Sequence, residues 1–111
     1  MIEAPTIDVV TAARMNSGGR ATLLDVREPD EWAAGQAPGA RHVPLAQLDP
    51  PTVGSRRPVI EVCRCGRRSA AAAGTLRVAG LNARDLTGGM TAWAQASLPV
   101  VTDDGKPGTV A

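Results

Sequence analysis

Short segments that contain apolar residues, separated by glycine, proline or helix-forming stretches, recur along the chain and predict strands, and the segment at 21–26 is the clearest apolar run. The predicted strands cover residues 21–26, 40–43, 59–62 and 83–86. Segments with helical spacing or helix-capping signals alternate with these runs, and the predicted helices cover residues 6–17, 29–34, 69–79 and 90–96. This alternation indicates an α/β fold with a mostly parallel sheet, whose ligands bind beyond the carboxyl ends of the strands.

Local signals set the limits of these elements and of the domain. Thr6 or Asp8 can cap the first helix, and the proline- and glycine-rich segment 49–58 is predicted to be a loop. The sequence contains no repeat and no interdomain linker, so residues 1–102 are predicted to form a single domain. Residues 103–111 are polar and contain glycine and proline, which predicts a flexible C-terminal tail.

The composition limits the kinds of partner and the cellular compartment that we expect for this protein. The chain has 111 residues, 43 % of them hydrophobic, but it has no Phe and no Tyr, so the core must be aliphatic with Trp32 and Trp93. No apolar run approaches the length of a spanning helix, and the N-terminus does not resemble a secretory signal. We therefore expect a cytoplasmic protein with no membrane partner.

The charge is balanced overall but concentrated locally. The net charge is +1, yet residues 56–68 hold five arginines and one glutamate, net +4, which leaves −3 for the rest. A balanced surface argues against a nucleic-acid partner, whereas a local cationic patch predicts a small anionic substrate.

Cys63 lies inside this patch, between a predicted strand and a predicted helix. An unperturbed thiol, with a pKa of about 8.5, is only about 3 % ionised at pH 7. A helix N-terminus and the arginines at positions 64, 67 and 68 both favour the thiolate at this place. The chain's two cysteines and one histidine cannot complete a four-ligand zinc site, so we expect no metal. In a reducing compartment both cysteines should be free thiols, and no cofactor is expected.

Four segments, in order, resemble the signatures of the rhodanese family. They are LLDVREPDEW at 23–32, GQAPGARHVPL at 35–45, CRCGRRS at 63–69 and LTGGMTAW at 86–93. The resemblance implies a rhodanese-like fold, a central parallel sheet with helices on both faces, and thiosulfate sulfurtransferase activity. It also implies that Cys63 is the nucleophile and carries a persulfide, whose sulfur passes to cyanide, a thiol or a protein acceptor.

The resemblance assigns further roles around the nucleophile. The loop residues Arg64, Cys65, Gly66, Arg67 and Arg68 would bind the donor, their backbone N–H groups cradling the persulfide and the arginine side chains holding the anion. The loop from Cys63 to Arg68 spans six residues. Sulfur-transferring members typically have six, whereas the related phosphatases and arsenate reductases typically have seven, so the length favours sulfur over phosphorus.

Supporting roles are predicted outside the loop. We expect Asp25 and Arg27 to form an ion pair that fixes the segment after their strand, and Ser69 to support the helix start. Glu61, in a strand predicted to be buried, is expected to pair with an arginine, because an unpaired buried carboxylate is costly.

Several alternatives stay open. Cys65 is either a spectator or a resolving thiol that attacks the persulfide on Cys63. The domain could instead be a sulfur carrier or regulatory module without turnover. The donor could be thiosulfate, glutathione persulfide, 3-mercaptopyruvate or a protein persulfide, and the arginines favour an anionic donor.

Overall fold

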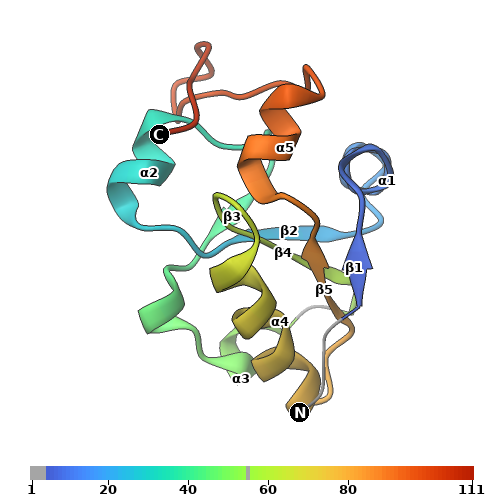
Figure 1. Ribbon diagram of the computed structural model, residues 1–111. Helices are drawn as coiled ribbons and strands as arrows, with labels where there is room; N and C mark the ends of the chain where they lie inside the picture. Colours follow the sequence, from blue (N-terminus) through green and yellow to red (C-terminus); the bar gives the residue numbers. More distant parts are fainter. Residues whose placement is uncertain (1–4, 55) are drawn as a thin grey trace.

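The computed structural model describes residues 5–54 and 56–111 and shows one parallel five-stranded sheet in the order β1-β5-β4-β2-β3 (Figure 1). The strands are β1 (Thr6–Ile7), β2 (Thr22–Asp25), β3 (Arg41–His42), β4 (Val59–Val62) and β5 (Ala83–Leu86). The helices are α1 (Val9–Ser17), α2 (Pro29–Ala34), α3 (Pro50–Val53), α4 (Arg67–Val78) and α5 (Gly89–Gln95), with a 3-10 turn at Leu45–Gln47. The predicted α/β class with a parallel sheet is confirmed.

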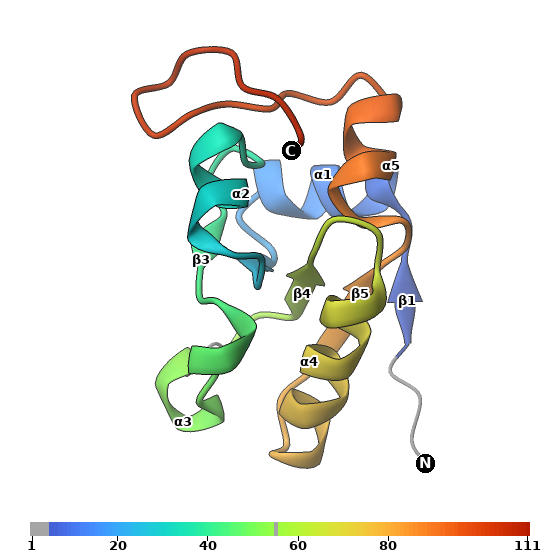
Figure 2. The ribbon, with the colours of Figure 1, turned by 60° about the vertical axis from the view of Figure 1, so that its left-hand side comes forward.

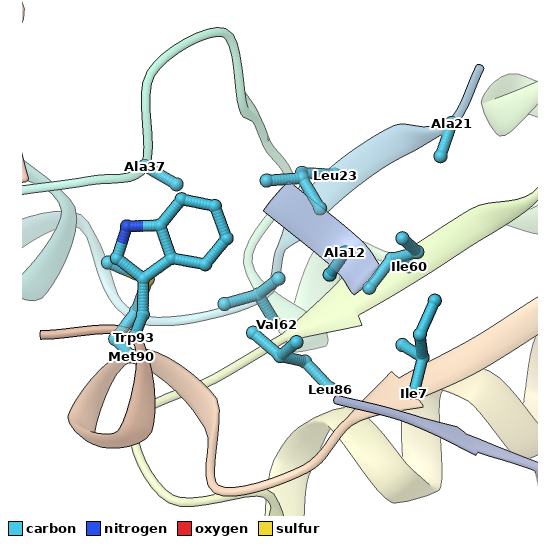
Figure 3. Packing of buried hydrophobic residues seen from close by; sticks show 10 residues of the cluster. All are labelled: Ile7, Ala12, Ala21, Leu23, Ala37, Ile60, Val62, Leu86, Met90 and Trp93. Carbon is cyan, nitrogen blue, oxygen red and sulfur yellow. The ribbon is translucent and has the colours of Figure 1, made fainter. Parts of the chain in front are cut away.

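Helices cover both faces of the sheet. α1 and α5 pack on one face, where Trp93 lies at one end of a cluster of mostly aliphatic side chains (Figure 3). α3 and α4 pack on the other face, against Leu24, Val59 and Ala83. All four residues of β4 are buried, because this central strand has a layer of helices on each side.

The first predicted helix and the predicted loop at 49–58 differ from the structure. Thr6 and Ile7 form an edge strand paired with β5, and the helix begins only after Asp8, whose Oδ1 accepts the Thr11 N–H at 2.7 Å. Inside 49–58, two prolines begin the short helix α3. A two-residue strand draws its hydrogen bonds from its neighbour, and proline is compatible with a first helical turn, so neither element has a strong local signal.

The C-terminal segment folds back over α2 instead of extending away as a loose tail (Figure 2). Val101 forms antiparallel bridges with Gln36 and Pro107, and the Thr109 N–H donates to the Ala34 carbonyl oxygen at 2.9 Å. Gly35 makes this packing possible, because a Cβ there would lie 2.4 Å from the Thr109 carbonyl oxygen. The composition does not predict these contacts, since backbone hydrogen bonds depend little on side-chain type.

The register of the sheet decides which side chains lie behind the nucleophile. Glu61 on β4 pairs with Asp85 on β5, and paired residues in a parallel sheet point to the same face. Because side chains alternate along a strand, Glu61 shares its face with Val59, in the layer packed against α4.

In the part of the chain that the structure describes, no helix is long and apolar enough to cross a bilayer.

Candidate active site

Cys63 directly follows β4, and three residues separate it from the first turn of α4. Its Sγ accepts a hydrogen bond from the Gly66 N–H at 3.0 Å and lies 3.2 Å from the Ser69 Oγ. The residue is 0 % exposed and packs against Val26 and Ala72. The sulfur therefore has two polar neighbours in an otherwise apolar pocket.

The loop carbonyls point toward α5. The Met90 N–H donates to the Cys63 carbonyl oxygen at 2.8 Å, and the Thr91 N–H donates to that of Arg64 at 3.0 Å. In a trans peptide the N–H points opposite to the carbonyl, so the amides of residues 64 and 65 face away from α5. Gly89 permits this approach, because a Cβ there would lie 2.3 Å from the Cys63 carbonyl oxygen.

Arg68 is paired with a carboxylate, whereas the sequence predicts that it holds the donor anion. Its guanidinium donates to Glu31 of α2 through two hydrogen bonds, of 2.6 and 3.0 Å. This pairing lowers the pKa of Glu31 to about 2 and raises that of Arg68 above its usual range. The exposed Arg64 and Arg67 make no side-chain hydrogen bond or ion pair to any described residue, so they are the available cations of the loop.

Asp25 and Arg27 form the expected ion pair, at 2.9 Å and fully buried, and neither is among the hydrogen-bond partners of the Cys63 sulfur. Arg27 also donates to the Gly35 carbonyl oxygen at 2.7 Å, and its own carbonyl oxygen contacts the His42 Nε2 at 2.8 Å. The ion pair thus links both ends of α2 to the sheet. It holds in place the helix that presents Glu31 to Arg68.

Behind the sulfur lie two buried carboxyl groups. Ser69 donates to the Asp85 Oδ1 at 2.5 Å, so the hydroxyl joins Cys63 to Asp85. The expected partner of Glu61 is absent: its two carboxyl oxygens are buried and hydrogen-bond to nothing in the described residues, so the predicted arginine pairing is wrong. Burial, together with the neighbouring Asp85 carboxylate, raises the pKa of Glu61 to about 8.

Cys65 differs from Cys63 in its surroundings. Both are free thiols, but Cys65 is exposed on the surface of the loop. Its side chain makes no hydrogen bond to the described part of the chain. Sequence reasoning did not single out Asp85 or the role of Glu31; the only local signal for Asp85 is its position at the end of a predicted strand, just before Gly88–Gly89.

Comparison with known proteins identifies the class. Residues 9–96 match the Rhodanese-like domain family. A sulfurtransferase of Allochromatium vinosum is 36 % identical over 86 residues, which cover 75 % of this chain and 80 % of that protein. A rhodanese-related protein of Thermoplasma volcanium, of known crystal structure, superposes with a TM-score of 0.81 at 31 % identity, covering 89 % of this chain and 99 % of that one.

The chain belongs to the rhodanese-like domain family. Membership does not by itself fix an activity, since an HTH-type transcriptional regulator of Mycobacterium tuberculosis is 35 % identical over 108 residues. That match covers 90 % of this chain but 46 % of the regulator, so the chain spans about half the length of this relative.

Proposed function

We propose that this protein is a thiosulfate sulfurtransferase that carries sulfur as a persulfide on Cys63. The observation that carries the proposal is the position of the Cys63 sulfur, which accepts the Gly66 N–H within a six-residue loop before α4. The loop amides and the N-terminus of α4 provide positive partial charges that favour a thiolate.

The chemistry is nucleophilic displacement at sulfur. The Cys63 thiolate attacks the outer sulfur of thiosulfate, the new S–S bond forms as the bond to sulfite breaks, and the persulfide anion remains on the enzyme. Cyanide or a thiolate then attacks the outer persulfide sulfur and releases the Cys63 thiolate. Both half-reactions conserve charge, and neither requires a cofactor.

Donor binding falls to Arg64 and Arg67, because Glu31 occupies the guanidinium of Arg68. Two free cations at the mouth of the loop suit a small dianion, which supports thiosulfate over an uncharged donor. The role of Arg68 is then to tie the start of α4 to α2, which holds the loop in shape. We place the reaction in the cytoplasm, where free thiols stay reduced.

The experiment measures thiocyanate formed from thiosulfate and cyanide, together with the intact mass after thiosulfate alone. We expect a gain of about 32 Da, one sulfur atom, as the covalent intermediate requires. Cys63→Ser should abolish both signals, and Cys65→Ser should retain both. Thiocyanate formation by the Cys63→Ser variant at the parent rate would refute the assignment.

The mass experiment also addresses the two open alternatives. A stable persulfide in the absence of acceptor supports Cys65 as a spectator, whereas loss of sulfur with a two-hydrogen deficit would assign it as a resolving thiol. A regulatory module is the second candidate, since Cys63 is 0 % exposed. Such a module would accept sulfur from thiosulfate but would not convert cyanide to thiocyanate catalytically.

A further inference from the structure

The Cys63 thiol has no direct contact with solvent through which to lose its proton. Cys63 and Ser69 are both 0 % exposed, whereas Asp85 is 8 % exposed. The Ser69 Oγ lies 3.2 Å from the Cys63 sulfur and donates to the Asp85 Oδ1. The other Asp85 oxygen lies near Gly66, 4.0 Å from where a Cβ would be. A continuous hydrogen-bonded path therefore runs from the buried sulfur to the least buried of the three groups.

The Cys63 Sγ, the Ser69 Oγ and the Asp85 Oδ1 can share their protons in two arrangements. In one, the Cys63 thiol donates to Ser69 and the Ser69 hydroxyl donates to an ionised Asp85. In the other, a protonated Asp85 donates to Ser69, and the hydroxyl donates to a Cys63 thiolate. The arrangements differ by the movement of one proton across each hydrogen bond, and the side chains need not move.

From this path we propose that Asp85, acting through the Ser69 hydroxyl, takes the proton of the Cys63 thiol and so forms the nucleophilic thiolate. One S–H and one O–H bond break, one new O–H bond forms on Ser69 and one on Asp85, and no electrons are transferred. The negative charge moves from Asp85 to Cys63, so the buried site keeps its net charge. The inference rests on the proposed function, in which Cys63 is the nucleophile.

The charges around the path are compatible with this transfer. Burial raises the pKa of Asp85 toward that of a thiol, although the Ser69 hydrogen bond opposes the shift. Glu61, the other carboxyl group on this face, is mostly protonated at pH 7 because its pKa is about 8. Glu61 therefore adds little negative charge beside the path at neutral pH.

Charged groups on the neighbouring elements favour the sulfur end of the path. Arg64 precedes α4, and Arg67 and Arg68 lie in its first turn. On the adjacent strands, Arg84 pairs in register with Ile60, on the opposite face of the sheet, and Asp25 is neutralised by its ion pair. Because Glu31 neutralises Arg68, the exposed Arg64 and Arg67 are the unpaired cations of the loop, and they favour a charge that has moved from Asp85 toward it.

The test uses Asp85→Asn, which retains an oxygen that can accept from Ser69 but cannot take a proton. Single-turnover persulfide formation from thiosulfate, and alkylation of Cys63 by iodoacetamide, are measured against pH in a Cys65→Ser background. At pH 7 we expect both rates to fall about ten- to thirtyfold, up to the ratio between a largely ionised and an unperturbed thiol. The rates of Asp85→Asn and of the parent protein should converge at a pH high enough for hydroxide to ionise an ordinary thiol.

Ser69→Ala provides the second arm, because it interrupts the same path while leaving Asp85 in place. It should slow both rates at pH 7, and Asp85→Asn should cause no further loss in the Ser69→Ala background. If Asp85 acted only through its negative charge, Asp85→Asn would raise both rates at pH 7, since removal of a nearby negative charge favours the thiolate. The proposal would be overturned if the rates rise in Asp85→Asn. It would also be overturned if Asp85→Asn lowers the rates by the same factor at every pH, both with and without Ser69→Ala.

The two readouts separate this proposal from the proposed function. Alkylation reports thiolate formation without any sulfur donor. If wild-type protein gains no sulfur from thiosulfate, the proposed function fails, while the alkylation profiles still decide the role of Asp85.

Discussion

Replacing Glu61 by glutamine should make the stability of the protein less sensitive to a rise in pH between about 4.5 and 8. Glu61 is 0 % exposed, and neither carboxyl oxygen has a hydrogen-bond partner among the described residues. Its pKa rises from the ordinary value of 4.5 to about 8 in the folded protein. The folded state therefore binds a proton that the unfolded chain has already lost across this interval, and unfolding becomes easier as pH rises.

The magnitude follows from the size of the shift. Each pKa unit corresponds to about 1.36 kcal/mol, so ionisation of the unfolded chain destabilises the folded state by about 0.8 kcal/mol at pH 5, about 3 at pH 7 and about 5 at pH 9. Glutamine has nearly the same shape and does not titrate. The free energy of unfolding of Glu61→Gln, relative to wild type, should thus rise by about 2.5 kcal/mol from pH 5 to 7 and by about 4 kcal/mol from pH 5 to 9.

Urea denaturation at these three pH values measures the difference directly, since all other titrating groups contribute to both proteins. Asp30→Asn serves as the control, because Asp30 is exposed and its substitution should leave a nearly constant difference. Parallel stability curves for wild type and Glu61→Gln would refute the reasoning. Such a result would mean that the carboxyl group gains a partner or reaches water in solution.

Two further predictions concern the loop around the nucleophile. Arg64→Ala combined with Arg67→Ala should raise the KM for thiosulfate about tenfold with little change in kcat, and the effect should shrink at high salt because the charges are exposed. Gly89→Ala should destabilise the fold by about 2–3 kcal/mol and slow persulfide formation, since its Cβ would lie 2.3 Å from the Cys63 carbonyl oxygen. Gly74→Ala is the matched control: its Cβ meets nothing within 4 Å inside α4, so thermal denaturation should show a gain of about 0.5–1 kcal/mol.

The elements that the sequence predicts well are those with local causes. The strands predicted at 59–62 and 83–86 coincide with β4 and β5, and the helix predicted at 29–34 coincides with α2. Each has a period or boundary signal within its own residues, such as Pro29 at the first helical position. The position of Cys63 at a strand end before a helix follows from the same local signals.

The partners of the charged residues depend instead on tertiary structure. Glu31 and Arg68 are 37 residues apart, and they meet only because the sheet brings α2 beside the start of α4. Glu61 faces Asp85 because of the register between β4 and β5, which no local pattern encodes. The sequence therefore indicates which residues are charged but not which charges are neutralised. The pairing of Arg68 with Glu31 is the reason that we propose donor binding by Arg64 and Arg67 without Arg68.

The distribution of charge across the site links its stability to its reactivity. Outside the sulfur, Arg64 and Arg67 are free to attract an anion; inside, Asp85 and Glu61 are buried on one face of the sheet. Two ionised carboxylates at that depth would oppose a thiolate, whereas one carboxylate can exchange its charge with the sulfur through Ser69. The high pKa of Glu61 keeps the inner charge near one at neutral pH. Ionisation of Glu61 in the folded protein, above about pH 8, should therefore disfavour the Cys63 thiolate in the range where its effect on the free energy of unfolding levels off.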